Sequence, residues 1–249
     1  MLTGTADPGA LARGAPTLAG FGTEPLKLHG VETLQIFCEI ERESSDALLP
    51  PGLHPTVPPA VTWLVQRVAE SPWGAFSLAQ CRIECRSGLR PRGFLRGGVV
   101  DCAEAGAALA ERWGYALRPG EIQLDRAYDR IRASVRVAGE EVLCAALRDP
   151  MPLRNADAYY VANVNLAHTP HGLRLVQVDP EFEVERAERG RPVVERFAAA
   201  AWNADGARPS YPVSGSFTIA AVTLPALRYV SRPDVLAFQG TERVDAQPG

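Results

Sequence analysis

Short segments rich in β-branched and aromatic residues, separated by turn residues, constrain the fold of this chain most. Three of them, 61–69, 75–86 and 93–100, are joined by the turn-forming sequences SPWG and RSGLRPRG, a pattern typical of antiparallel strands. Similar segments follow in the second half, among them RIRASVRV, YYVANVNLAH and SGSFTIAAVTLP. Because exposed strand edges invite aggregation, many short strands favour a closed or nearly closed antiparallel barrel. A barrel of this size can hold one small ligand inside.

Helical signals are few. The clearest is DCAEAGAALAERWG, in which Asp101 is an expected N-cap, Glu104 completes a capping box and Gly114 ends the helix. SSDALLP predicts a short helical turn, and ERFAAAAW predicts a second short helix. The fold class predicted is therefore mainly β (α+β), with one or two short helices.

Composition narrows the class of protein further. A chain of 249 residues with 46% hydrophobic residues and a net charge of −3 fits a globular domain without the basic surface that nucleic acids require. No apolar run approaches about 20 residues, and the N-terminus lacks a secretory pattern, so we expect no membrane span and a cytoplasmic protein. We expect a flexible arm at 1–25, a single domain at 26–240 and a tail at 241–249.

Motifs that could bind metals or cofactors are weak. His168 and His171 in HTPH flank Pro170 in a predicted turn, which favours a loop over a metal site. Cys81 and Cys85 lie four residues apart on a predicted strand, a spacing that favours packing in the core. We therefore expect no metal and no cofactor.

Arginine replaces lysine almost throughout. Lys27 is the single lysine among 26 basic residues. A guanidinium binds anions but forms no imine with a carbonyl compound, so the chain has almost no groups for lysine chemistry. A local run of arginines at residues 86, 90, 92 and 96 is interpreted as exposed hairpin arginines, with an anion site as the alternative.

The order of segments resembles the acetoacetate decarboxylase family from about residue 26 to 233. The motifs that carry this resemblance are LKLHGVETLQIFCEI, LLPPGL, SPWGAFSLAQ, AYYVANVNLA and SGSFTIAAVTLPALRYV. The resemblance implies a cone-like antiparallel β barrel with a central cavity, in a protein that usually forms oligomers.

The departures from the family pattern bear on function. The family's decarboxylases use a lysine that forms a Schiff base, and in this chain Leu117 occupies that position, with Arg118 next to it. Only the glutamate before this segment is retained, as Glu111. Three further charged pocket positions of the family become apolar here: Val31, Trp63 and Leu78. Imine decarboxylation is therefore excluded.

These residues predict a small-molecule enzyme with non-Schiff-base chemistry on a carbonyl or carboxylate substrate. Enolisation, dehydration or cyclisation, as in secondary metabolism, would make it lyase-like or isomerase-like. Glu111 is the candidate general base, Arg118 would bind a carboxylate or stabilise an enolate, and Tyr115 could donate a proton. The apolar pocket, suited to a larger or greasier ligand than a short keto acid, would be shaped by Val31, Trp63, Leu78, Trp113 and Leu117.

Two alternatives stay open. Glu111 could instead form a structural ion pair at a helix end. The whole domain could be a non-catalytic barrel that binds a small ligand. In either case the segment GLRLVQVD and the last strand carry more apolar residues than one barrel face needs, which predicts a homo-oligomer.

Overall fold

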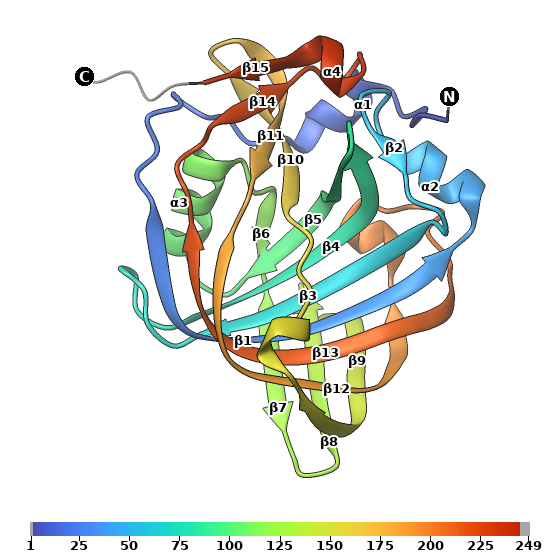
Figure 1. Cartoon of the computed structure of the whole chain (residues 1–249), viewed down its shortest axis with the longest axis vertical. Helices are drawn as coiled ribbons and strands as arrows, with labels where there is room; N and C mark the ends of the chain where they lie inside the picture. The colour runs from blue at the N-terminus through green and yellow to red at the C-terminus, as the bar shows by residue number, and fades with distance from the viewer. Residues whose placement is uncertain (1, 245–249) are drawn as a thin grey trace.

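One large sheet that coils on itself makes up most of the molecule (Figure 1) in the computed structural model, which describes residues 2–244. The hydrogen-bonded strand order is β15-β14-β11-β10-β5-β4-β3-β1-β13-β12-β9-β8-β7, with β2 on β4 and β6 on β5. Most pairs are antiparallel, whereas β5 pairs in parallel with β6 and β10. The mainly β fold predicted from the sequence is confirmed, although this ladder ends at β15 and β7 within the described residues. The strands are β1 (Leu26–Ile40), β2 (His54–Pro55), β3 (Ala60–Val68), β4 (Phe76–Ser87), β5 (Arg90–Val100), β6 (Leu117–Pro119), β7 (Glu121–Arg126), β8 (Arg130–Val137), β9 (Glu140–Leu153), β10 (Asn163–Thr169), β11 (Gly172–Val178), β12 (Glu181–Phe197), β13 (Pro209–Leu224), β14 (Tyr229–Ser231) and β15 (Thr241–Arg243).

Helices are short and lie at the margins of the sheet. They are α1 (Pro8–Leu11), η1 (Ala12–Gly14), α2 (Arg42–Leu48), α3 (Ala103–Trp113), η2 (Asn155–Asp157), η3 (Ala199–Trp202) and α4 (Ala237–Gly240). None of them, within residues 2–244, has the length and apolar character needed to cross a membrane.

The long helix α3 begins differently from the prediction and ends as predicted. Gly114 terminates it with φ at 71°, the left-handed conformation that glycine adopts without steric cost. Its N-cap is Cys102, which makes no capping bond with its side chain. Asp101 instead accepts a hydrogen bond from the Ser77 backbone N at 2.7 Å, which ties the start of α3 to β4.

The central strands are buried on both faces. In β4, Cys81, Ile83 and Cys85 pack into one hydrophobic core, and Phe76 and Leu78 pack into a second core on the opposite face. This alternation follows from the two-residue repeat of a strand. Core packing of the two cysteines, predicted from their spacing, is confirmed.

The N-terminal segment is not a free arm. Asp7 caps α1 with bonds to the backbone N of Gly9 and Ala10. The backbone N of Gly4 donates to Leu53 O at 2.9 Å, and that of Leu18 donates to His168 O at 2.8 Å. The buried side chain of Leu18, at 1% exposure, and the partly buried Leu11 and Ala15 hold this segment against the core, a contribution that its loop-like composition conceals. At the other end, residues 241–243 of the expected tail form β15, and residues 245–249 lie outside the described part.

Strand β12 was not predicted. Its sequence is polar, and the side chains at Glu181, Glu183 and Glu185 are exposed, so it lacks the apolar run that identifies buried strands. It nevertheless pairs with both β9 and β13. The helix expected at 195–202 does not form as predicted. Strand β12 continues to Phe197, and only the short η3 follows it.

The apolar side chains of β11 are used inside the chain. Leu175 packs in one core, and Val176 and Val178 pack in the other, all at 0% exposure. The apolar side chains of β11 from which a homo-oligomer was predicted are therefore buried on both faces of the strand within the chain. Assembly stays a prediction without that support.

Candidate functional site

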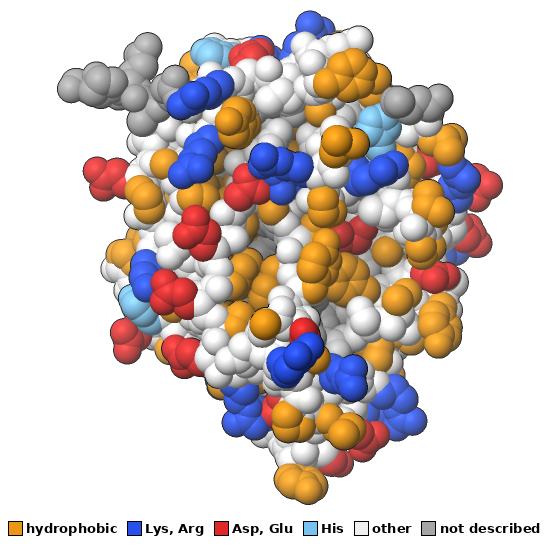
Figure 2. Space-filling view, viewed as in Figure 1, with side chains coloured by type: hydrophobic (Ala, Val, Ile, Leu, Met, Phe, Trp, Pro, Cys, Tyr) orange, Lys and Arg blue, Asp and Glu red, His pale blue; other side chains and the backbone are white. Residues whose placement is uncertain are grey.

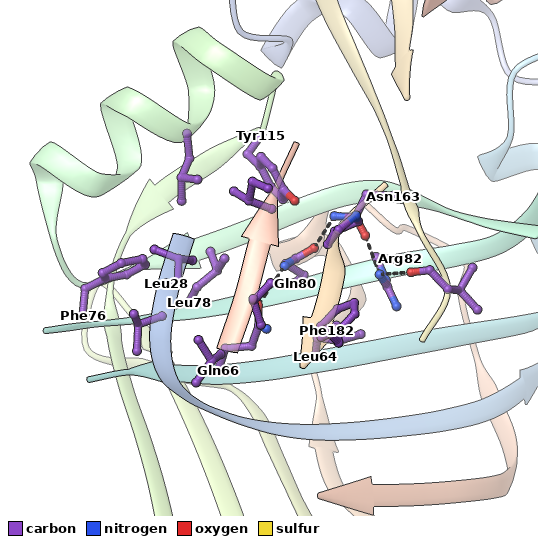
Figure 3. Close-up of a pocket in the computed structure, with 17 residues that line it drawn as sticks. Leu28, Leu64, Gln66, Phe76, Leu78, Gln80, Arg82, Tyr115, Asn163 and Phe182 are labelled. Carbon is purple, nitrogen blue, oxygen red and sulfur yellow. Dashed lines mark hydrogen bonds between the residues drawn. The ribbon is translucent and has the colours of Figure 1, made fainter. Parts of the chain in front are cut away.

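A small cavity lies on the α3 side of the central strands (Figure 3). Its volume is about 40 Å³, roughly three times the 10–15 Å³ that a cavity needs to hold one water molecule. Hydrophobic side chains also gather in a recess at the centre of the face drawn in Figure 2, with charged side chains around it. The cavity walls are mostly apolar and include Leu28, Leu64, Phe76, Leu109 and Phe182.

A row of polar side chains crosses this apolar lining. Asn163 Nδ2 donates to Gln80 Oε1 at 2.8 Å, Gln80 Nε2 donates to Gln66 Oε1 at 3.3 Å, and Gln66 Nε2 donates to Thr33 Oγ1 at 3.2 Å. The row thus spans β10, β4, β3 and β1. Each amide fixes the orientation of the next, so Asn163 turns its Oδ1 towards Arg82, which donates to it from Nη1 (Figure 3).

Arg82 carries a buried charge that makes no direct ion pair with a carboxylate in the described structure. Its side chain is fully enclosed, with 1% exposure, and its Nη1 also donates to Val161 O at 3.0 Å. The Nε and Nη2 atoms are buried and have no hydrogen-bond partner in the described structure. Burial lowers the pKa of the guanidinium. A buried cation without a direct ion pair is costly, and the N–H groups of two unpartnered guanidinium nitrogens can donate to a carboxylate.

Glu84 interacts electrostatically with Arg82 but makes no direct ion pair with it. It lies two residues further along β4, and its Oε1 accepts a hydrogen bond from Thr62 Oγ1 at 2.6 Å. Burial raises the pKa of the Glu84 carboxyl, while Arg82 and Thr62 act to lower it. Within the described part of the chain, no ion pair joins Arg82 to a carboxylate at 4.0 Å or less.

Tyr115 supplies a proton donor at the cavity. Its side chain is buried at 3% exposure and lines the cavity with Arg82 and Asn163. Burial raises the pKa of its hydroxyl to about 12, against smaller lowering effects of Arg82 and of a hydrogen bond with Asn163. The hydroxyl therefore stays protonated at neutral pH and can donate to a ligand oxygen.

Three of the residues singled out from the sequence line the cavity: Val31, Leu78 and Tyr115. Trp113 and Leu117 belong to the same apolar cluster but stand behind the lining. Trp63 lies on the opposite face of β3, where its ring meets Phe197 edge-on at 4.8 Å. The sequence analysis placed Trp63 in the pocket, but its neighbour Leu64 lines the cavity instead.

Glu111 and Arg118 lie away from the cavity lining. Glu111 is exposed on α3, so a base at this position does not reach a ligand inside the cavity. Arg118 donates from Nη2 to the carbonyl of Ala201 in η3. Partial burial lowers the pKa of Arg118. Arg118 therefore holds the end of η3, whereas the sequence analysis expected it to bind a ligand carboxylate.

Four polar residues of the cavity were missed in the sequence: Gln66, Gln80, Arg82 and Asn163. A signal for two of them exists in β4, where Gln80, Arg82 and Glu84 alternate with the apolar residues of one core face. That alternation places the polar side chains together on the other face. The burial of that face depends on β1, β3 and β10, which the local sequence does not reveal.

The HTPH motif lies at the turn between β10 and β11, as predicted. There His171 Nδ1 is 3.0 Å from Glu242 Oε2. Residues 2–244 contain no group of three or more His, Cys, Asp or Glu side chains arranged to hold a metal ion.

The segment between η2 and β10 covers the Arg82 end of the cavity. The Tyr160 ring stacks on Phe182 with 3.8 Å between ring centroids, and Gln35 Nε2 donates to Tyr159 O at 3.0 Å. Because Val161 O accepts from Arg82, the same segment contacts the buried guanidinium directly.

Replacing Tyr160 by alanine should loosen this segment. The lost ring stack contributes about 0.5–1.5 kcal/mol beyond burial, so amide exchange at 158–162 should accelerate roughly tenfold. Hydrogen–deuterium exchange with mass spectrometry measures this, with Tyr159→Ala as the control, since Tyr159 is 58% exposed. Equal exchange in the two variants would contradict the role of the stack.

Comparisons with known proteins match this geometry at the level of the fold. The family model described as acetoacetate decarboxylase (ADC) matches residues 14–232. An acetoacetate decarboxylase structure from Legionella pneumophila is 19% identical, with a TM-score of 0.72 over 82% of this chain and 86% of that one. The enduracididine biosynthesis enzyme MppR, complexed with pyruvate, is 17% identical, with a TM-score of 0.69 over 83% and 90%.

A third structure, an acetoacetate decarboxylase-like enzyme from Sphingomonas wittichii, is 16% identical, with a TM-score of 0.66 over 89% of this chain and 94% of that one. At these identities the likeness concerns the fold. No curated protein sequence gives a match.

Proposed function

The chain belongs to the acetoacetate decarboxylase family, and we propose that its cavity binds a small keto acid and promotes enolisation without a Schiff base. The observation that carries this proposal is the buried Arg82, whose Nε and Nη2 lack partners beside the protonated Tyr115. The enzyme MppR, which has a similar fold, was solved in complex with pyruvate, and this is consistent with a ligand of the same class.

Each group has a defined role in this proposal. Arg82 holds the carboxylate through the N–H groups of its free Nε and Nη2. Tyr115 donates a hydrogen bond to the carbonyl oxygen, where negative charge develops as the neighbouring C–H bond breaks. The departing proton passes to water, because the part of the lining that the structure describes contains no lysine, histidine or carboxylate side chain. Glu111 has no part in this scheme.

The cavity volume supports a small ligand. About 40 Å³ leaves no room for the drug-sized molecules that occupy pockets of about 300 Å³ or more. The larger, greasier ligand expected from the apolar substitutions does not fit this volume. The apolar walls instead strengthen the electrostatic contacts of a short keto acid by lowering the local dielectric constant.

Exchange of the pyruvate methyl protons in D₂O tests the enolisation step. The wild-type protein should accelerate the loss of the methyl signal in proton NMR. Tyr115→Phe should slow this exchange about 100-fold, because one donor to the developing oxyanion is lost. Tyr211→Phe, at an exposed tyrosine, is the matched control. Exchange at wild-type rate in Tyr115→Phe would remove Tyr115 from the mechanism.

Non-catalytic binding is the second candidate function. The lack of a strong base among the lining side chains favours it. It predicts that pyruvate binds in an Arg82-dependent manner but that its methyl protons exchange only at the background rate. The same NMR samples therefore distinguish the two functions.

Imine trapping should fail. The single lysine, Lys27, forms an ion pair with Glu183 at 3.0 Å on the surface, and its side chain is outside the cavity lining. Treatment with acetoacetate and borohydride is therefore expected to add no mass and to release no carbon dioxide above background. An adduct mapped to Lys27 by peptide mass spectrometry would contradict this expectation.

A further inference from the structure

A second, larger groove lies apart from the central cavity and shares none of its lining residues. Its volume is about 520 Å³, within the range of about 300–1,000 Å³ typical of small-molecule sites. It is formed by the turn between β4 and β5, α4, and single residues of β2, β11, β14 and β15. These elements meet at the end of the molecule drawn uppermost in Figure 1.

The groove displays large apolar side chains to solvent. Leu89, in the β4–β5 turn, is 93% exposed, and Phe238, in α4, is 70% exposed. The turn and α4 are close neighbours, since a Cβ built on Gly88 would lie 3.9 Å from the Cβ of Ala237. Two solvent-exposed apolar side chains at one concave surface favour a ligand with an apolar body.

The polar lining is neutral or basic. It comprises Arg90, His54, Ser87, Gln177, Tyr229 and Thr241, and contains no carboxylate among residues 2–244. Ser87 is 7% exposed, and its Oγ is buried without a hydrogen-bond partner in the described structure. Arg90 is exposed at the rim. In a chain of net charge −3, an acid-free groove with an arginine favours an anionic head group.

We propose that this groove is a second ligand site, for an amphipathic monoanion with an apolar body and one carboxylate or sulfonate. The apolar body packs between Leu89 and Phe238, and Arg90 attracts the anionic head. The site is independent of the enolisation proposed for the central cavity, and variants in the two sites test the two proposals separately.

Paired fluorescent probes test both parts of the ligand. 8-Anilino-1-naphthalenesulfonate carries the anionic group, and N-phenyl-1-naphthylamine has the same ring system without it. The wild-type protein should bind the sulfonate more tightly, and added salt should weaken this preference. Arg90→Gln should abolish the preference and its salt dependence. Phe238→Ala should weaken binding of both probes about tenfold.

The variants concern exposed side chains, so folding is preserved, and circular dichroism verifies this. Tyr211→Ala, at an aromatic side chain with 64% exposure, is the matched control and should bind both probes as the wild type does. Decanoate and 1-naphthoate distinguish acyl from aromatic bodies by displacement of the sulfonate probe, and displacement by either supports the site.

Three results would overturn the proposal. The first is unchanged probe binding in Phe238→Ala, and the second is displacement by neither acid. The third is a change of sedimentation coefficient in Phe238→Ala, which would identify the groove as an interface between copies of the chain. Pyruvate exchange should be unaffected in every one of these variants.

Discussion

Replacing Arg82 by methionine is expected to weaken pyruvate binding between about tenfold and 150-fold. A hydrogen bond to a charged group contributes about 1.5–3 kcal/mol, and the free Nε and Nη2 are the donors to the ligand in the proposed complex. Stability should change little. The variant no longer buries an unpaired charge, and this gain offsets the bonds lost at Asn163 Oδ1 and Val161 O.

Arg92→Met is the matched control for this experiment. Arg92 is also a buried arginine, at 4% exposure, but it pairs with Asp179 at 2.7 Å and lies outside the cavity lining. Its loss should lower the melting temperature and leave pyruvate affinity unchanged. Calorimetric titration and thermal unfolding measure both quantities. Wild-type affinity in Arg82→Met would exclude Arg82 as the carboxylate-binding group.

Replacing Trp113 by alanine should lower the free energy of unfolding by about 3–5 kcal/mol. The ring is fully buried in the core beside α3, and its Nε1 donates to Pro225 O at 2.8 Å. Deleting it leaves a cavity and an unsatisfied carbonyl. Urea denaturation measures the loss, and a midpoint like that of the wild type would contradict the role of Trp113 as a core residue.

Trp73→Ala provides the comparison for Trp113. Trp73 is half-buried at the edge of the same core, with its ring centroid 6.2 Å from that of Phe76. Replacing Trp73 should lower the free energy of unfolding clearly less than replacing Trp113. A sequence-based argument placed Trp113 in the pocket, and the expected loss of stability shows why a loss of activity in its alanine variant would not locate the site.

Much of the fold could be predicted because local physical chemistry decides it. The capping glycine at Gly114 ends α3, and alternating apolar residues with intervening turns identify the strands β3, β4 and β5. The order of the motifs along the chain was enough to identify the family. Strand β12 was missed because its exposed polar face hides a role that only its partners β9 and β13 define.

The candidate site depended on tertiary structure for a different reason. Strand β3 is buried on both faces, so its sequence does not tell which of Trp63 and Leu64 faces the cavity. The sequence of α3 does not tell whether Glu111 faces the cavity or the solvent. Only the packing of the helix shows that Glu111 is exposed.

The sequence by itself determined which chemistry is impossible. Lys27 is the single lysine and lies at the start of the first strand, and Leu117 occupies the position of the family's Schiff-base lysine, so the sequence predicts that no imine forms. Only the tertiary structure decided which groups remain for other chemistry. Arg82 is one of 25 arginines in the sequence, and it lacks a direct ion pair because β3, β5 and β10 surround it without a carboxylate within 4.0 Å in the described structure. Burial and charge pairing are properties of neighbours in space, and neighbours in space are not encoded by any single segment of the chain.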